Sequence, residues 1–482
     1  MNIVATIRVI AVAGALSVLG ATAFVIWLGH DPTRHFVESV PGMDGRTGTP
    51  TRAEEAIRIG EHFVAGTGVV ADLPGAWPRF RGVNADNIST ERVALAEAWP
   101  TNGPPLLWTI PLGEGHAAPA VLHGRVYVLD YDEQKKGDAL RCLSLADGSE
   151  IWRRWYKVQV KRNHGMSRTV PAVTEQYVVT IGPRCQVMCV KAQSGDFLWG
   201  LDLVKEYGTE VPGWYTGQCP LIDDGLAIIA PAGSNTLMLA VDCASGAVVW
   251  RAPNPRMWKM SHASVMPMTL RGKYMYVYCA IGGMAGVSAR GADRGQVLWE
   301  TTLWSKSVVA PSPLVMDDGL IYLTAGYSAG SMLVRVAATN GGYAVTKLQE
   351  LKPNEGLASE QQTPIRYQGC LFAVLPKDGG PSKNEFACSR ADDCRALQWT
   401  SGKENRFGLG PFIIADGKIF LLNDDGELTL LQASTNAYRQ LARARIMNGR
   451  DAWGPLALAG SRLLLRDDKR VVCIDVGAAP RN

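Results

Sequence analysis

The sequence lacks several short motifs that would assign a chemistry directly. Its ten cysteines include no adjacent pair, no C-x-x-C and no C-x-x-C-H, so their spacing indicates neither a thiolate zinc site nor covalent haem. No H-E-x-x-H occurs, which leaves the commonest zinc-hydrolase helix without support. Long Lys or Arg runs are also missing and the formal net charge is only +4. Nucleic-acid binding therefore has no electrostatic footprint.

Charged residues are few, 20% beside 47% hydrophobic residues, which predicts a packed globular protein with a sizeable core. Charge is missing altogether from residues 9–28, a run that matches the hydrocarbon thickness of a membrane if it is helical. Arg8 precedes this run and predicts that residues 1–8 stay cytoplasmic while the rest is exported. We expect residues 9–28 to be a transmembrane anchor or uncleaved signal sequence. The A-x-A pattern at residues 21–23 leaves a cleaved signal peptide as the alternative.

Cysteine is also scarce in polar loops. Most of the cysteines lie in apolar or strand-like stretches, where a free thiol behaves as a small hydrophobe. Only Cys388 and Cys394 bracket a polar loop, CSRADDC. This pair is the candidate for one local disulfide.

What the sequence does contain is a repeat. CLSLADGSEIW from Cys142, CVKAQSGDFLW from Cys189, AVDCASGAVVW from Ala240 and ARGADRGQVLW from Ala289 align without gaps, each with glycine four residues before tryptophan. A short apolar strand, a polar turn with glycine and a second strand ending in Trp predict a β-hairpin. The alignment places Cys142 at a small-residue position of a buried strand, not in a redox or metal site.

A second marker counts the repeats independently, because a proline followed by an apolar strand recurs eight times, at Pro119, Pro171, Pro220, Pro267, Pro313, Pro364, Pro411 and Pro455. Intervals of 44 to 52 residues leave room for four short strands per unit, the period of a propeller blade. The last unit lacks its outer strand, and PPLLWTIPLG, residues 104–113, can supply one and close the ring.

These markers predict an all-β fold: an eight-bladed β-propeller of four-stranded blades over residues 77–477, closed by an N-terminal outer strand and preceded by one N-terminal transmembrane helix. Residues 29–76 are expected to form a linker, and residues 478–482 a C-terminal tail. Within the linker, TRAEEAIRIGEHF, residues 51–63, has a Thr cap and early acidic residues that predict a short helix.

The A-x-D-x-x-T-G-x-x-x-W type of repeat, eight times over with a split last blade, resembles the pyrroloquinoline-quinone-like (PQQ-like) β-propeller family. The WPRFRG stretch, residues 77–82, resembles the lead-in of its membrane-anchored bacterial members. The chain is also similar in fold to the propeller lipoprotein of the outer-membrane β-barrel assembly machinery, although no cysteine precedes Cys142 to carry a lipid. The same ring serves quinoprotein dehydrogenases and non-enzymatic scaffolds, so the resemblance implies the fold more than the function.

Loops that enter the innermost strands of a propeller crowd around one mouth of its central channel, so residues just before the eight prolines are the site candidates. They predict a polar pocket for an anionic or planar ligand or a protein side chain, with hydrogen bonds between blades as the structural alternative. No catalytic residue or metal site is predicted. The candidate ligand- or partner-binding residues are His116, His164, Arg168, Tyr215, His262, Glu360, Arg406, Asp451 and Trp453.

Tryptophan recurs at one position per blade, and we expect these residues to dock neighbouring blades in the core: Trp108, Trp152, Trp199, Trp250, Trp299 and Trp399. Tryptophans outside this register are better candidates for an exposed partner surface, among them Trp214, Trp258, Trp304 and Trp453.

Together these patterns favour a non-catalytic, membrane-anchored, extracytoplasmic β-propeller that acts as a protein-binding scaffold or assembly factor. We expect a single-pass protein of a bacterial cytoplasmic membrane, with its propeller on the periplasmic side and a protein partner in or near that membrane. The first alternative is a quinoprotein dehydrogenase with PQQ and calcium; otherwise no cofactor is predicted. The adjacent cysteines and haem motif of the family's enzymes are missing, which weakens that alternative. A propeller that binds a polysaccharide or small ligand is the second alternative.

Overall fold

The computed structural model describes residues 3–29 and 57–479 of the chain. It divides into two compact units, residues 1–56 and residues 57–482. The first contains helix α1 (Ile3–Gly29), within which Ile10–Gly29 has a mean hydropathy of 2.1. By length and composition this helix is able to span a membrane, and a signal sequence near the N-terminus would meet the same criteria.

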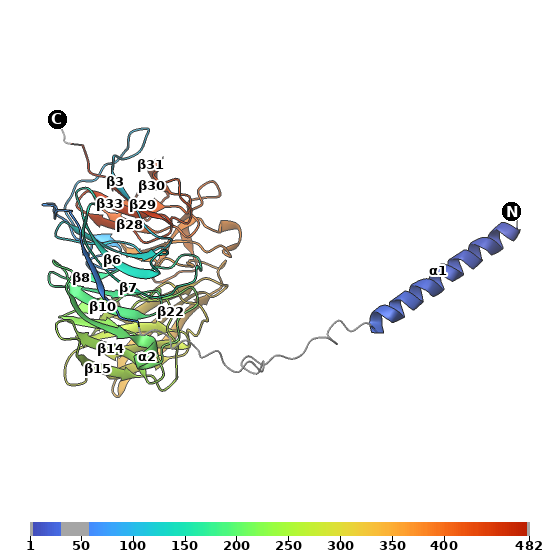
Figure 1. Cartoon of the computed structure of the whole chain (residues 1–482), viewed down its shortest axis with the longest axis horizontal. Helices are drawn as coiled ribbons and strands as arrows, with labels where there is room; N and C mark the ends of the chain where they lie inside the picture. The colour runs from blue at the N-terminus through green and yellow to red at the C-terminus, as the bar shows by residue number, and fades with distance from the viewer. Residues whose placement is uncertain (1–2, 30–56, 480–482) are drawn as a thin grey trace. The chain divides into compact units, whose positions relative to one another are not determined.

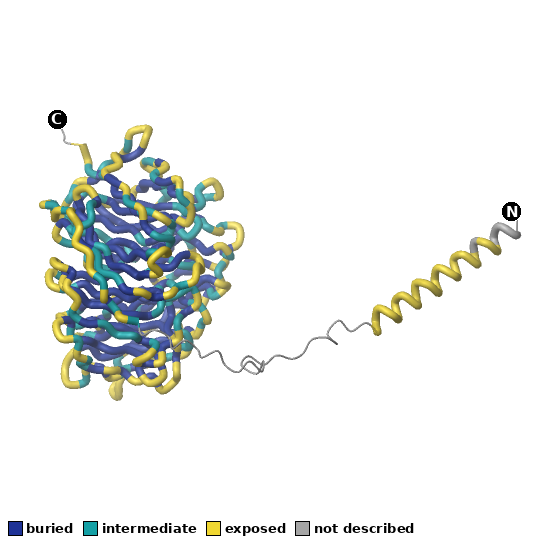
Figure 2. The backbone as a smooth tube through the Cα atoms, viewed as in Figure 1, coloured by how far each residue is buried: buried dark blue, intermediate teal, exposed yellow. Residues whose placement is uncertain are grey.

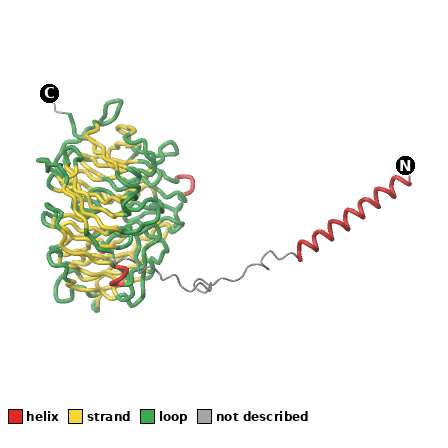
Figure 3. Tube along the Cα trace, viewed as in Figure 1, coloured by secondary structure: helices red, strands yellow, loops and turns green. Residues whose placement is uncertain are grey.

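The second unit is a ring of eight antiparallel sheets, which we call blades 1 to 8 in chain order (Figures 1 and 3). Each blade contains four consecutive strands apart from the last, as the proline spacing predicted. Figure 2 shows that the strands are buried and the turns exposed, because each sheet packs between two neighbours. The eight-bladed propeller is thus confirmed.

The strands of the first four blades have the following bounds. Blade 1 contains β4 (Ala120–Leu122), β5 (Arg125–Asp132), β6 (Gly137–Ser144) and β7 (Glu150–Lys157). Blade 2 contains β8 (Ala172–Val173), β9 (Tyr177–Ile181), β10 (Gln186–Lys191) and β11 (Phe197–Asp202), followed by the short helix α2 (Leu203–Tyr207). Blade 3 contains β12 (Leu221–Asp223), β13 (Leu226–Ile229), β14 (Thr236–Asp242) and β15 (Val248–Pro253). Blade 4 contains β16 (Met266–Leu270), β17 (Lys273–Ala280), β18 (Gly283–Ser288) and β19 (Val297–Thr301).

The later blades follow the same plan, with two short 3₁₀ turns, η2 (Asp317–Gly319) and η3 (Gly380–Ser382). Blade 5 contains β20 (Leu314–Val315), β21 (Leu320–Ala325), β22 (Gly330–Thr339) and β23 (Gly342–Leu351). Blade 6 contains β24 (Ile365–Tyr367), β25 (Cys370–Val374), β26 (Phe386–Arg390) and β27 (Leu397–Thr400). Blade 7 contains β28 (Phe412–Ala415), β29 (Lys418–Leu422), β30 (Glu427–Gln432) and β31 (Gln440–Arg445). Blade 8 contains β32 (Ala457–Ala459), β33 (Arg462–Arg466), β34 (Arg470–Asp475) and β3 (Leu106–Pro111).

Blade 8 closes the ring with a strand from the other end of the propeller, as the sequence predicted. β3 pairs antiparallel with β34, and Trp108 lies opposite Cys473. The indole nitrogen of Trp108 then donates to the carbonyl of Leu145 in blade 1, 3.1 Å away. Closure therefore joins the sheet within blade 8 and also locks that blade onto the next one.

The repeated glycine and tryptophan form one contact between neighbouring blades. Trp152 of blade 1 donates its indole N–H to the carbonyl of Gln193 in blade 2, at 3.1 Å. Two residues further on, Gly195 has φ +71°, and a Cβ there would lie 2.7 Å from Cδ2 of Trp152. Glycine is thus needed both for the left-handed turn and for the close approach of the ring. Trp108, Trp199 and Trp250 pack in the same way against Gly148, Gly246 and Gly295 of the next blade. Trp299 is also buried, but it packs against Gly286 and Met275 of its own blade, and Trp399 is half-buried.

The segment before the propeller departs from the prediction in its described part. Residues 51–56 of the expected helix lie outside the described residues, and residues 57–63 form no helix. Instead the chain turns at residues 59–60 and enters β1 (His62–Ala65), which pairs antiparallel with β7 as a fifth strand of blade 1. Pairing with the exposed edge of β7 satisfies backbone groups that an isolated short helix would leave to water. The linker expected over residues 29–76 therefore gives way to the propeller unit by residue 57.

Residues 77–89 cross the central channel. Trp77 exchanges two backbone hydrogen bonds with Val121 of blade 1, each 2.8 Å long, and the carbonyl of Pro78 accepts one from Val173 of blade 2. Further along, the buried Arg81 donates to the carbonyl of Thr363 beside blade 6. β2 (Ile88–Ser89) then pairs parallel with β28 of blade 7. Blades 2 and 6 face each other across an eight-membered ring, so this segment spans its centre.

All ten cysteines are free and buried. The small, buried position predicted for Cys142 is confirmed, since its side chain is fully buried between blades 1 and 2. The disulfide considered between Cys388 and Cys394 does not form. Cys388, on β26, packs toward blade 7, and Cys394, in the loop that follows β26, packs toward blade 5, so the two thiols lie in different core clusters.

Candidate functional site

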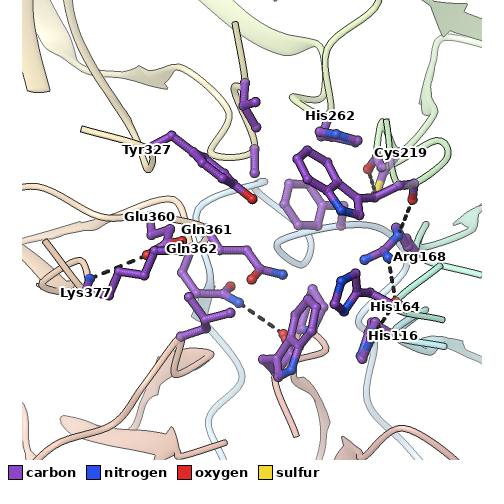
Figure 4. Close-up of a pocket in the computed structure, with 18 residues that line it drawn as sticks. His116, His164, Arg168, Cys219, His262, Tyr327, Glu360, Gln361, Gln362 and Lys377 are labelled. Carbon is purple, nitrogen blue, oxygen red and sulfur yellow. Dashed lines mark hydrogen bonds and ion pairs between the residues drawn. The ribbon is translucent and has the colours of Figure 1, made fainter. Parts of the chain in front are cut away.

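One mouth of the central channel contains a pocket of about 300 Å³ (Figure 4). Its walls come mainly from the loops that precede the innermost strands, as the sequence predicted for a site. Phe80, on the segment that crosses the channel, also lines the pocket and gives it an aromatic floor. Six of the nine candidate binding residues lie in this lining: His116, His164, Arg168, His262, Glu360 and Trp453.

His116 and Trp453 form one aromatic wall. Their rings stack at 3.8 Å between centroids with an interplanar angle of 18°. The imidazole also contacts the carbonyl of His164, with Nε2 3.2 Å from the oxygen. Burial, helped by the nearby Arg168 and Arg466 cations, lowers the pKa of His116 to about 3. His116 is therefore a neutral stacking platform at physiological pH and not a cation.

Arg168 is the cation beside this wall, and its guanidinium shares the His164 carbonyl with the His116 ring. Its guanidinium donates to three backbone carbonyls, those of Asn163, His164 and Trp214. Burial lowers its pKa to about 10, so the side chain stays charged at neutral pH. No carboxylate pairs with Arg168 among the described residues. The pocket thus contains a positive charge balanced only by neutral carbonyl dipoles.

Two further pairs complete the mouth. Tyr327, on the turn between β21 and β22, stacks on Trp214 with centroids 5.8 Å apart and is 55% exposed. Lys377, after β25, binds Glu360 with Nζ 2.8 Å from Oε1 and lies 5.0 Å over the Tyr327 ring. His262 lies beside Trp214, and burial together with the Arg168 charge lowers its pKa to about 4. Figure 4 shows these groups arranged around one opening.

Three candidate residues do not line the pocket, and the structure gives them local roles. The Tyr215 hydroxyl bonds both the N–H and the carbonyl of Lys161, which ties two neighbouring loops together. The guanidinium of Arg406 donates to the carbonyls of Lys403, Lys383 and Pro381. Asp451 is exposed, and its carbonyl accepts a bond from the backbone of Trp453.

Two tryptophans expected at the surface are buried instead. Trp258 is 6% exposed and Trp304 is fully buried. Trp258 packs over Gly282 and Gly283, where an added Cβ would lie 2.5 Å and 2.3 Å from the indole. Because glycine has no side chain, the indole ring of Trp258 fits against the backbone at these two positions. The spacing of the repeat did not predict this contact.

Sequence reasoning missed Phe80, Tyr327 and Lys377. Tyr327 and Lys377 lie on turns within a blade. The candidates were chosen from the loops before the eight prolines, so these two residues were not among them. Tyr327 belongs to GYSAG, residues 326–330, which has the G-x-S-x-G spacing of a nucleophile elbow. Here it is a hairpin turn between antiparallel strands, and no hydrogen bond joins the Ser328 hydroxyl to a histidine in the described part of the chain.

The side chains that line this pocket do not favour metal binding or thiol chemistry. Within residues 3–29 and 57–479, no group of three or more His, Cys, Asp or Glu side chains is placed to hold a metal ion. Cys219 lines the pocket, and burial raises the pKa of its thiol to about 11. The arrangement is therefore suited to binding through stacking, charge and hydrogen bonds.

Comparison with known proteins gives a family and a fold. The family model described as outer membrane protein assembly factor BamB matches residues 135–380, about half of the chain. No curated protein matches the sequence.

Among solved structures, the quinohemoprotein alcohol dehydrogenase ADHIIG from Pseudomonas putida HK5 is 11% identical, with a TM-score of 0.57 over 87% of this chain and 85% of that one. A europium-containing methanol dehydrogenase is 11% identical, with a TM-score of 0.57 over 83% and 89%. BamB from Moraxella catarrhalis is 14% identical, with a TM-score of 0.48 over 77% and 99%. At such identities the two dehydrogenases share the fold alone with this chain.

Proposed function

We propose that this chain, which belongs to the family described as outer membrane protein assembly factor BamB, is a non-catalytic, membrane-anchored propeller that binds a protein partner at its pocket mouth. Fold does not decide function, since the same ring occurs in the quinoprotein dehydrogenases. The proposal therefore rests on the residues of the pocket.

The observation that carries the proposal is the aromatic pair at the mouth next to an unneutralised arginine. Trp214 precedes the first strand of blade 3 and Tyr327 lies on a turn of blade 5, yet their rings stack at 5.8 Å, and Tyr327 keeps 55% of its surface exposed. Exposed Trp, Tyr and Arg side chains dominate binding hot spots, because rigid rings bury a large area at small entropic cost. Stacking holds Tyr327 in place before any partner arrives, which lowers that cost further.

The alternative of a quinoprotein dehydrogenase requires calcium beside the quinone, and the pocket residues do not fit that ion. Calcium takes six to eight oxygen ligands, commonly with several carboxylates. Glu360 is the one carboxylate among the described residues that line the pocket, and Lys377 already binds it at 2.8 Å. An ion at this site would have to displace that lysine and take its remaining side-chain oxygen ligands from Gln361, Gln362 and the Tyr327 hydroxyl.

Membrane attachment is the second part of the proposal. Helix α1 is uncharged from Ile10 to Gly29, and Arg8 stands on its N-terminal side. We propose that it remains as an anchor, with the propeller on the extracytoplasmic side, by the rule that positive charge stays inside. The length of the apolar run supports an anchor over a cleaved signal peptide.

Site-specific photo-crosslinking tests the proposal. Benzoylphenylalanine at position 327 should capture one membrane or envelope protein in cells, whereas the same group at Phe197, 40% exposed on the edge of blade 2, should not. Trp453→Ala should weaken the product at 327, because it removes the ring that stacks on His116. Equal products at both positions, or none at 327, would rule out the pocket mouth as the interface. Dye reduction by the purified chain with PQQ and calcium would contradict the non-catalytic part.

A further inference from the structure

We propose that the pocket recognises a carboxylate attached to an apolar group, with the carboxylate at Arg168 and the apolar group among the aromatic walls. The inference rests on the proposed function and names the chemistry that the site would take. Four observations on the pocket carry it: a donor count, a charge balance, two unpaired polar side chains and the shape of the walls.

The donor count concerns Arg168. A guanidinium has five N–H donors, one on Nε and two on each Nη. Nε donates to Trp214, and Nη2 donates to both Asn163 and His164. Nη1 has no partner among the described residues, so two N–H groups of a partly buried cation remain for a ligand. Three fixed carbonyl contacts hold the guanidinium in place, so binding costs little ordering of this side chain.

The charge balance favours a single negative charge. Lys377 and Glu360 neutralise each other, with 2.8 Å between their charged atoms. Burial lowers the pKa of His116 to about 3 and that of His262 to about 4, so both rings are neutral at pH 7. The three charged side chains of the described lining, Arg168, Lys377 and Glu360, therefore sum to one positive charge, which is centred on Arg168. A monoanion matches this charge, whereas a dianion such as phosphate would also face Glu360.

Two unpaired polar groups complete the oxygen-binding face. Neither the Tyr327 hydroxyl nor the Gln361 amide makes a hydrogen bond in the described part of the chain, and both residues line the pocket. In Figure 4 both side chains point toward the middle of the opening, with Arg168 on the far side. The Tyr327 and Arg168 side chains are close enough to interact electrostatically. A carboxylate between them would accept from a cation, a hydroxyl and an amide, which suits its lone pairs.

The apolar walls of the pocket determine which kind of group the carboxylate can be attached to. Trp453, Trp214 and Phe80 present rings to the cavity, and Leu409 adds an aliphatic contact. The volume, about 300 Å³, has room for one aromatic or branched side chain together with its carboxylate. The segment of residues 77–89 crosses the channel below, so a ligand enters from the mouth and is held by its end. The C-terminal residue of a polypeptide and a free apolar acid both have this chemistry.

Calorimetry on the full-length chain in detergent tests the inference. The probes are 3-phenylpropionate, its neutral amide, and a hexapeptide ending in phenylalanine as the free acid and as the C-terminal amide. At least one free acid should bind, and its amide should bind about 10-fold to 100-fold more weakly, because a charge-assisted hydrogen bond is lost. Binding of the peptide acid alone would identify a protein terminus as the source, and binding of the small acid alone a metabolite. Equal binding of acid and amide, or no binding of either acid, would overturn the inference.

Variants assign any binding to the pocket. Arg168→Met should weaken the acid about 10-fold or more, and Tyr327→Phe about 5-fold, since it removes one neutral hydrogen bond. Arg406→Met is the matched control, because Arg406 also binds three loop carbonyls but lies outside the pocket. If Arg168→Met fails to fold, acid binding by Tyr327→Phe and Gln361→Met tests the inference instead, because neither side chain has a hydrogen-bond partner among the described residues that its loss would disturb. Unchanged acid binding in these two variants would contradict the inference.

The two proposals fail separately. A crosslink at position 327 without carboxylate binding would support the proposed protein-binding function and contradict the proposal that the pocket binds a carboxylate. Carboxylate binding without a crosslinked protein would contradict the proposed protein partner and support a pocket that binds a small acid.

Discussion

Replacing Asp138 by asparagine should stabilise the propeller, and by more at pH 8 than at pH 5. Asp138 lies on β6 and is 1% exposed. The hydroxyl of Tyr156 donates to its Oδ2 at 2.9 Å, and Gly182 of blade 2 packs so closely that an added Cβ would lie 2.5 Å from that oxygen. Burial, with a smaller contribution from Asp130, raises the pKa of Asp138 to about 7, and the Tyr156 bond offsets only part of this rise.

The sign follows from proton binding. In the unfolded chain this carboxyl ionises near its ordinary value of 3.8, whereas in the fold it keeps its proton up to about pH 7. The folded state therefore binds more protons between these values, and its stability falls as the pH rises through them. Each pH unit costs about 1.4 kcal/mol, so the interval from pH 5 to pH 7 costs about 3 kcal/mol. Above pH 7 the loss is complete.

The asparagine variant removes this loss because its amide stays neutral and its oxygen still accepts from Tyr156. Unfolding entropy of about 2 cal/mol/K per residue gives about 0.9 kcal/mol/K for the roughly 420 residues of the propeller unit. The melting-temperature difference between Asp138→Asn and the native chain should therefore grow by about 3 °C from pH 5 to pH 8. Differential scanning calorimetry of the full chain in detergent measures it.

A control and a refuting result complete this experiment. Asp147, in an exposed turn of the same blade, has its pKa lowered by bonds from Ser149 and is ionised throughout this pH range. Asp147→Asn should therefore change the melting temperature by an amount that does not vary from pH 5 to pH 8. A constant difference for Asp138→Asn as well would show that Asp138 is ionised in the fold, and the reasoning from burial would be wrong.

Three more predictions concern the ring itself. Gly195→Ala should destabilise the propeller by about 2 kcal/mol, seen as a lower melting temperature, because it combines left-handed strain with a clash against Trp152; no change would refute the close contact. Arg81→Gln should expose residues 77–89 to limited proteolysis, since it loses bonds to carbonyls beside blade 6; an unchanged digest would mean that Arg81 does not hold this segment. Cys142 should resist thiol reagents without denaturant, because burial raises its pKa to about 12; rapid labelling would contradict its burial.

Features that repeat along the chain could be predicted from sequence. The glycine and tryptophan of each hairpin meet through one local geometry, with Trp152 against Gly195 as the example, so the repeat revealed the blades and their contacts. The same spacing exposed the missing outer strand of blade 8, which β3 supplies. Features that occur once were harder. The helix expected before residue 63 gave way to β1, because pairing with β7 outweighs the helix propensity of a short segment.

The sequence by itself determined the class of fold, the number of blades, the closing strand, the apolar helix and the mouth at which most of the candidate binding residues gather. Hydrophobic patterns and turn residues act between residues that are close in sequence, and here the same pattern recurs in each blade, so it can be recognised without the structure. Only the tertiary structure decided which side chains face the pocket. Tyr327 and Lys377 reach it from turns within blades, and Phe80 reaches it because residues 77–89 cross the channel. The sequence already named Arg168 as a candidate binding residue, and the structure added that its partners among the described residues are three backbone carbonyls and no carboxylate. The pocket joins residues from several blades and from the crossing segment, so it exists only after the chain has folded into the ring.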